Sequence, residues 1–162
     1  MKRLTLLVIT AMLTIALLMA GCTGDDNGDE EEEELETAPT FTLDSTENET
    51  IKLSSYLGKV VILDFMFINC GPCQTEMDHL EDVYDHYSES QVVIISIDTQ
   101  TDTETVEELR TYKAQEGYEW IFCMDTKSVG ETKYDTSTYP TLFIVNKEGK
   151  IRYFLDKKWI KI

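Results

Sequence analysis

Two of the four cysteines of the chain, Cys70 and Cys73, are separated only by Gly71 and Pro72. A continuous apolar run from 60 to 68 precedes this motif, and a stretch with apolar residues at helical spacing follows it. The pattern predicts a buried strand, a tight turn and a helix that begins at the cysteines, because proline suits the first turn of a helix. Two cysteines three positions apart at a helix start can close a small disulfide ring. The motif therefore indicates redox chemistry.

The helix start predicts different roles for the two thiols. Unpaired N–H groups and the helix dipole favour a thiolate at Cys70, so we expect a lowered pKa and attack by this residue on other disulfides. Cys73 lies one turn deeper, where we expect a less exposed thiol that resolves the mixed disulfide.

Two structural alternatives compete with the redox interpretation. A zinc site would need a second pair of cysteine or histidine ligands, and His79, His86 and Cys123 do not have paired-ligand spacing. An inert disulfide is the other alternative, although a position at a helix start argues against it. We expect no metal and no cofactor.

The first 22 residues are typical of a targeting segment. Lys2 and Arg3 form a positive start, an apolar run extends from 4 to 19, and Ala20-Gly21-Cys22 follows. Small residues directly before a cysteine resemble a lipoprotein signal, so we expect residues 1–21 to be removed and Cys22 to carry lipid. An uncleaved anchor is the alternative, and about 17 apolar residues lie at the short limit for a span. Either way, we expect the domain at the outer face of the cytoplasmic membrane.

We expect residues 22–37 to form a tether and residues 38–162 to form the folded domain. Nine acidic residues lie between Thr23 and Glu36, and their self-repulsion predicts an extended, disordered spacer, with an acidic binding tail as the alternative. The formal net charge of the chain is −17. This charge argues against binding to nucleic acid and to anionic lipid surfaces.

Strands and helices alternate along the domain. We expect buried or half-buried strands at 41–43, 51–53, 60–68, 92–97, 120–124, 141–145 and 151–155. We expect helices at 77–87, 106–117 and 127–134, with Asp102 or Thr103 as the cap of the second one. This alternation indicates an α/β domain that an antiparallel hairpin closes. Cys123 falls in an apolar run and is expected to be a core residue.

Four stretches of this sequence resemble a known family. They are Pro39–Leu43, Leu57–Phe65, Cys70–Cys73 and Tyr139–Val145 with Gly149-Lys150 after it. Together they are similar to thioredoxin-fold proteins of the redoxin (AhpC/TSA-like) group, specifically TlpA/ResA-like membrane-tethered thiol-disulfide oxidoreductases. The resemblance covers about residues 39–155. It implies a thioredoxin-like fold in which helices flank a central mixed sheet.

The resemblance also implies roles for individual residues. Cys70 matches the attacking cysteine, Cys73 the resolving one, Pro140 a cis-proline packed against the pair, and Asp64 the buried acid beneath the site. The substrate-binding positions that it implies are Tyr139, Pro140, Gly71 and Pro72. Residue chemistry supports the catalytic acid independently, because a lone carboxylate in an apolar strand should have a raised pKa and can accept a proton from Cys73. A structural aspartate and an ordinary trans proline are the alternatives.

Three positions depart from the family pattern. Asn69 stands where the family usually has tryptophan, and Met66 replaces an aromatic residue, so we expect a changed partner choice or redox potential. The stretch 156–162 is too short for the family's last helix. We therefore expect a truncated C-terminal helix and an incompletely covered sheet face, with Trp159 and Ile160 as partial substitutes.

The leading hypothesis is an enzyme that exchanges dithiol for disulfide with exported proteins or with a membrane redox partner. The Gly-Pro pair resembles reducing members, which would require a membrane electron donor. A thiol peroxidase is one alternative, although Leu63 and Phe67 replace the family's usual proline and threonine or serine. A carrier that holds copper or zinc through the two thiolates is the other. We expect a monomer that binds the membrane through its lipid.

Overall fold

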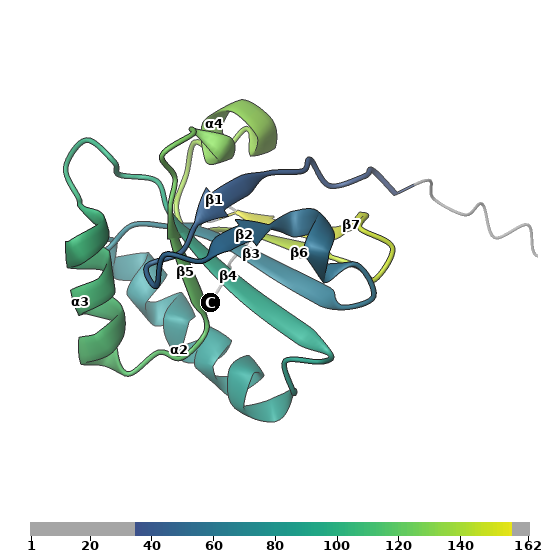
Figure 1. Ribbon diagram of the computed structural model, residues 1–162, viewed down its shortest axis with the longest axis horizontal. Coiled ribbons are helices and arrows are strands. Elements are labelled where there is room, and N and C mark those ends of the chain that lie inside the picture. Colours follow the sequence, from purple (N-terminus) through teal and green to yellow (C-terminus); the bar gives the residue numbers. More distant parts are fainter. Residues whose placement is uncertain (1–34, 157–162) are drawn as a thin grey trace, which may run out of the picture. The chain divides into compact units, whose positions relative to one another are not determined.

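The computed structural model describes residues 35–156 (Figure 1). The expected signal segment at 1–21, the lipidation site Cys22 and most of the tether lie outside the described residues. The same holds for Trp159 and Ile160 and for the expectation of a truncated C-terminal helix.

Seven strands and four helical segments make up the described part of the chain. The strands are β1 (Thr42–Asp44), β2 (Thr50–Lys52), β3 (Val60–Met66), β4 (Val92–Asp98), β5 (Ile121–Met124), β6 (Thr141–Val145) and β7 (Ile151–Asp156). The helices are the 3-10 turn η1 (Leu53–Tyr56) and the α-helices α2 (Gly71–His86), α3 (Val106–Glu116) and α4 (Val129–Tyr134). None of these helices has the length and apolar character that crossing a membrane requires.

A five-stranded sheet in the order β5-β4-β3-β6-β7 forms the centre of the domain. Strands β3, β4 and β5 run parallel, whereas β6 and β7 run antiparallel to their neighbours. The central position of β3 explains its almost continuous apolar sequence, since both of its faces are buried. The expected α/β architecture with a mixed sheet is confirmed, as is the closing antiparallel hairpin of β6 and β7. Strands β1 and β2 pair antiparallel in a small sheet of their own.

The two faces of the sheet are covered by different layers (Figure 1). Val61, Leu63 and Phe65 of β3 pack in one core with residues of β1, β2, η1 and α4. Ile62 and Met66 pack in the other core, with residues of α2 and α3. Because side chains alternate along a strand, Asp64 belongs to the face that α2 and α3 cover.

The cap of α3 differs from the prediction. Thr105 caps this helix, because its Oγ1 accepts a hydrogen bond from Glu108 N and Glu108 Oε2 accepts one from Thr105 N. This reciprocal capping box satisfies two helix-start donors, so the prediction of Asp102 or Thr103 was wrong. Gly117 ends the helix at a positive φ of 83°.

The ordered contacts of the domain begin before residue 38. The carbonyl of Glu36 accepts a hydrogen bond from Ile151 N at 2.8 Å, and Thr37 forms a bridge with Lys150. The last two residues of the expected tether therefore pair with the start of β7. On that strand, Tyr153, Phe154 and Leu155 are exposed within the described residues.

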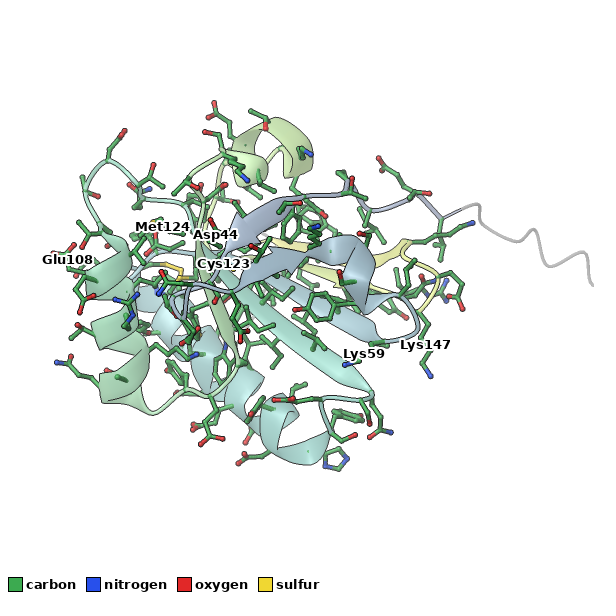
Figure 2. All side chains as sticks on the ribbon, in the orientation of Figure 1. Asp44, Lys59, Glu108, Cys123, Met124 and Lys147 are labelled. Atoms are coloured by element: carbon green, nitrogen blue, oxygen red, sulfur yellow. A yellow bond between two sulfur atoms is a disulfide. The ribbon has the colours of Figure 1, made fainter. Side chains whose placement is uncertain are left out.

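Cys123 on β5 is a core residue, as expected. Its side chain has no exposed surface, and it forms a bridge with Ser45, next to Asp44 at the end of β1 (Figure 2). Burial raises the pKa of this thiol to about 12. Cys123 is therefore an unreactive thiol at physiological pH.

Candidate active site

The cysteine motif forms the start of helix α2. Cys70 and Cys73 are joined by a disulfide, with their Cα atoms 5.2 Å apart. Cys70 occupies the N-cap in an extended conformation, and its Sγ accepts a hydrogen bond from Cys73 N at 3.2 Å. Only 4% of Cys70 and 1% of Cys73 is exposed, whereas Gly71 and Pro72 between them are exposed.

This capping geometry defines the chemistry available to the reduced pair. In the reduced protein, a thiolate at Cys70 would occupy the place of a capping oxygen and receive both the N–H of Cys73 and the field of the helix dipole. Both interactions favour the thiolate form and hence nucleophilic attack. The position of Cys70 thus supports its expected role as the attacking residue.

The turn that leads into Cys70 is held by a residue from a distant part of the chain. Glu104 Oε2 accepts the N–H of Ile68 at 2.9 Å, and Oε1 accepts both the N–H and the Nδ2 of Asn69 at 3.3 and 3.0 Å. Strand β3 therefore ends at Met66 and not at Ile68 as expected, because these N–H groups turn away from the sheet. The Asn69 side chain is anchored by the same carboxylate.

Asp64 lies in β3 on the face that α2 covers. Only 1% of the residue is exposed, and its Oδ2 accepts a hydrogen bond from Ser96 Oγ at 2.8 Å. Trp120 Nε1 in turn donates to Ser96 Oγ at 3.0 Å. Burial raises the pKa of the Asp64 carboxyl to about 7, and the hydrogen bond from Ser96 opposes that shift. A carboxyl with this pKa can exchange protons near neutral pH.

Glu76 is a site residue that the sequence analysis missed. It lies on α2 one turn after Cys73, and its Oε2 is buried with no partner within residues 35–156. Burial, followed by the charge of Asp64, raises the pKa of Glu76 to about 8. A charge on Asp64 therefore favours the protonated form of Glu76.

A signal for Glu76 exists in the sequence. The buried residues of α2 are Cys73, Met77 and Leu80, which define its apolar stripe. Glu76 lies beside that stripe, since residues three and four apart share a helix face. A carboxylate at this border, three residues after a reactive cysteine, marks a position of interest.

The Tyr139–Pro140 segment lies at the same end of the sheet as the cysteine motif. Its peptide bond is cis, and Thr141, directly after it, pairs with Phe65 near the end of β3. The ring of Tyr139 packs edge-to-face against Phe67, in the turn before the motif, at a centroid distance of 5.5 Å. The structure therefore brings this expected substrate-binding segment next to the turn that leads into the disulfide.

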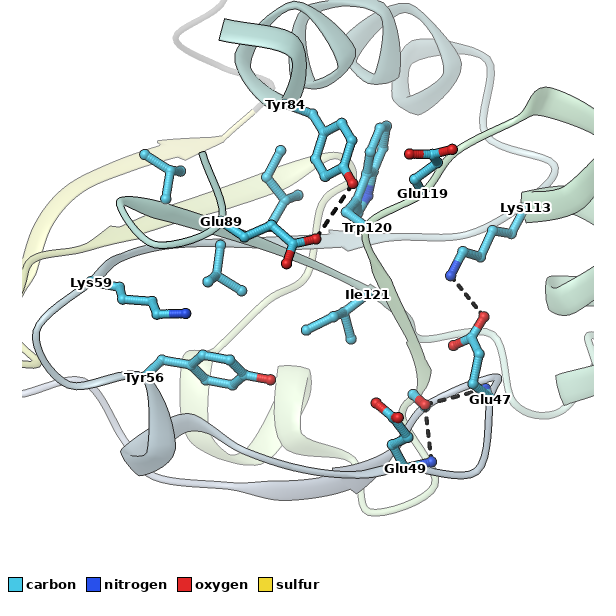
Figure 3. A pocket seen from close by; sticks show the side chains of 14 residues that line it. Glu47, Glu49, Tyr56, Lys59, Tyr84, Glu89, Lys113, Glu119, Trp120 and Ile121 are labelled. Atoms are coloured by element: carbon cyan, nitrogen blue, oxygen red, sulfur yellow. Dashed lines mark hydrogen bonds and ion pairs between the residues drawn. The ribbon is translucent and has the colours of Figure 1, made fainter. Parts of the chain in front are cut away.

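An open hollow beside Gly71 of the motif is lined mainly by residues with polar side chains. Its volume is about 340 Å³, and its lining residues are Gly71, Gln74, Thr75, Asp78, Tyr112, Glu116 and Tyr118. A separate pocket of about 360 Å³, which Tyr56, Lys59, Tyr84 and Trp120 help to line, contains neither cysteine (Figure 3). Open, polar surroundings at the disulfide suit contact with another protein surface more than an enclosed small molecule.

The described part of the chain contains no cluster of side chains that could bind a metal ion. Within residues 35–156, no group of three or more histidine, cysteine, aspartate or glutamate side chains could hold an ion. Cys70 and Cys73 thus have no third protein ligand within this part.

Comparisons with known proteins agree with this geometry. The model of the AhpC/TSA family matches residues 35–154. The thiol-disulfide oxidoreductase ResA of Bacillus subtilis strain 168 is 29% identical over 153 residues, which cover 93% of this chain and 84% of ResA. The ResA of Bacillus cereus strain ZK / E33L is 32% identical over 70% of this chain and 64% of its own length.

A solved structure shows the same fold. The exposed lipoprotein thioredoxin Etrx1 of Streptococcus pneumoniae superposes with a TM-score of 0.59 at 21% identity. The match covers 73% of this chain and 89% of that one. At this identity, the likeness shows the thioredoxin-like fold alone.

Proposed function

The chain belongs to the AhpC/TSA family, and from this premise we propose that it is a thiol-disulfide oxidoreductase that reduces disulfides in exported proteins. The observation that carries the proposal is the Cys70–Cys73 disulfide at the start of α2, with the sulfur of Cys70 at the helix cap. The ResA relatives, which are named thiol-disulfide oxidoreductases, support the reaction class.

The proposed reaction transfers two electrons from the cysteine pair to a client. The Cys70 thiolate attacks one sulfur of the client disulfide, and the other client sulfur leaves as a thiolate that takes up a proton. Cys73 then loses its proton and attacks Cys70, which releases the second client sulfur. The products are a client dithiol and the Cys70–Cys73 disulfide, the state that the structure contains.

Proton movement in the second step is assigned to Asp64. Cys73 is 1% exposed, so a buried base is needed to take its proton. The pKa of Asp64, about 7, suits that task near neutral pH. Glu76, with a pKa of about 8, provides a second carboxyl close to Asp64 that can hold a proton.

The client is proposed to bind along the turn and the cis-proline segment. Gly71 and Pro72 are exposed beside the disulfide, and Tyr139 and Pro140 lie at the same end of the sheet. An extended client segment could pair with the backbone there, as peptides add to open strand edges elsewhere. Regeneration of the dithiol then requires a two-electron donor, which we propose to be a membrane protein.

A redox titration of the purified chain tests the proposed direction. We expect the midpoint potential of the Cys70–Cys73 pair to lie nearer the thioredoxin value of about −270 mV than the DsbA value of about −120 mV. The wild-type chain should also reduce the disulfides of a model protein such as insulin, and Cys70→Ala should not.

Other results with the same purified chain would contradict the proposed disulfide reductase function. A potential near that of DsbA would make the protein an oxidant. Stoichiometric copper binding by the reduced chain, or rapid peroxide consumption without disulfide reduction, would favour the carrier or the peroxidase instead.

We further propose that residues 1–21 are a lipoprotein signal and that residues 22–37, the last two of which pair with the domain, are a tether. Residues 38–162 then form the thioredoxin-like domain at the outer face of the cytoplasmic membrane. The sequence Ala20-Gly21-Cys22 supports this proposal. The name of the pneumococcal relative, an exposed lipoprotein, agrees with it.

The anchoring proposal predicts the mass and location of the mature protein. Mature chains should begin at a lipidated Cys22 and fractionate with membranes, and Cys22→Ser should prevent the lipid from being attached. Intact-mass measurement of the membrane fraction checks this result. Recovery of wild-type chains that retain residues 1–21 would show an uncleaved anchor.

A further inference from the structure

Asp98 is a buried carboxyl beside the active-site turn that the proposed reaction does not use. It is the last residue of β4 and has no exposed surface. Its Oδ1 accepts the N–H of Gln100 at 2.8 Å, but its Oδ2 has no partner within the described residues. Asp98 pairs in register with Met66, at the end of β3, so it lies on the same face of the sheet as Asp64.

The neighbour of Asp98 is the residue that holds the turn before Cys70. Glu104 is 7% exposed, and its carboxylate accepts the backbone N–H groups of Ile68 and Asn69. Its backbone N–H donates to Gln100 O at 2.8 Å, which links the two acidic residues through one short loop. The Glu104 carboxyl is close enough to act on that of Asp98. Two buried carboxyls this near each other cannot both be charged without a large electrostatic cost, so one of them holds a proton.

The hydrogen bonds already present indicate that Asp98, and not Glu104, holds this proton. The two oxygens of Glu104 already accept three hydrogen bonds from the turn, so Glu104 is the acceptor of the pair. Asp98 accepts one donor and has a free buried oxygen. A proton on that oxygen would find its acceptor in Glu104, which removes the only unpaired atom of the arrangement.

We propose that Asp98 is a positioning residue for Cys70: in its neutral form it donates a hydrogen bond to Glu104, whose carboxylate holds the turn that presents Cys70. The inference rests on the proposed function, since it concerns the same cysteine. It adds a pH limit to that function, because the turn is held only while Asp98 keeps its proton.

Burial and the neighbouring Glu104 carboxyl raise the pKa of Asp98 to about 8. The charged groups that line the same hollow as Glu104 are Glu107, which pairs with Arg110, and Glu108; Asp125 donates its N–H to Asp98 O. Within residues 35–156, no lysine or arginine contributes to this shift. Above pH 8, loss of the proton places two like charges side by side and weakens the hold on the turn.

The pH profile of Cys70 reactivity tests the role of Asp98. The full chain in detergent is reduced in a Cys73→Ala background, and the alkylation rate of Cys70 is followed on its own peptide by mass spectrometry. Asp98→Asn keeps the donor to Glu104 and the acceptor for Gln100 but does not ionise. We expect the rate ratio of Asp98→Asn to Asp98 to be constant from pH 6 to 7 and to rise about threefold by pH 9.

Hydrogen–deuterium exchange tests the contact between Glu104 and the turn. In Glu104→Gln, the amides of Ile68 and Asn69 should exchange about tenfold faster than in wild type, because two charge-assisted hydrogen bonds are lost. Glu107→Gln, the same change on the exposed first turn of α3, should leave these amides unchanged.

Two results would overturn the inference. One is an Asp98→Asn to Asp98 rate ratio that does not change between pH 6 and 9, which a purely structural role would give. The other is full protection of both amides in Glu104→Gln. Neither measurement depends on turnover, so absence of disulfide reductase activity would refute the proposed function and leave the positioning result intact.

Discussion

Cys73→Ala should accumulate client proteins joined to Cys70 by a disulfide, whereas Cys70→Ala should accumulate none and lose turnover by about a thousandfold or more. Cys70 is the capping residue of α2 and lies beside the exposed Gly71 and Pro72, so its sulfur meets the client first. Removing Cys73 leaves the first attack intact and removes the thiol that releases the client in the proposed reaction.

Non-reducing gels of cells that express each variant check this division of labour. The adducts of Cys73→Ala should disappear when reductant is added. Cys123→Ala serves as the matched control, because this buried thiol with a raised pKa should take no part in exchange. If adducts formed in Cys70→Ala and not in Cys73→Ala, the helix-start assignment of the nucleophile would be refuted.

Asp64→Asn should slow disulfide reduction at pH 7 by about tenfold to a hundredfold, because general base catalysis of this kind contributes about that much or more. The asparagine can still accept the hydrogen bond from Ser96, so the local structure should be retained. It cannot take the proton from Cys73. The deficit should shrink at alkaline pH, where the thiol loses its proton to solvent.

The same variant should be more stable than wild type at alkaline pH. Folding raises the pKa of Asp64 from 3.8 to about 7. Below pH 3.8 the carboxyl is protonated in both states. Between pH 3.8 and 7 the unfolded chain ionises it while the folded protein keeps the proton, so stability falls across this range and levels off above pH 7. The unfolding free energy of wild type should therefore fall by about 4 kcal/mol relative to that of Asp64→Asn between pH 4 and pH 8.

Rate profiles from pH 6 to 9 and denaturant titrations at pH 4 and pH 8 check both parts of this prediction. Asp82→Asn, the same change at an exposed position of α2, is the control and should alter neither quantity. Equal rates for Asp64→Asn and wild type across the whole range would show that Asp64 is only structural.

The sequence by itself determined the local features of this protein. The apolar run before Cys70, the proline after it and the helical spacing beyond predicted a strand, a turn and a helix, and all three are present. A lone aspartate in a buried strand was enough to predict a raised pKa for Asp64, because desolvation depends on the apolar neighbours that the same strand supplies.

Only the tertiary structure shows which residues from other elements support the cysteine motif. Glu104 holds the turn before Cys70 across 36 and 35 residues of sequence, and the path of the loop after β4 alone brings it there. The proposed role of Asp98 follows from its position beside Glu104. The pKa of Glu76 likewise depends on how α2 packs over Asp64. Sequence spacing reports neighbours on one strand or one helix, whereas these carboxyls interact because separate elements pack together at one end of the sheet.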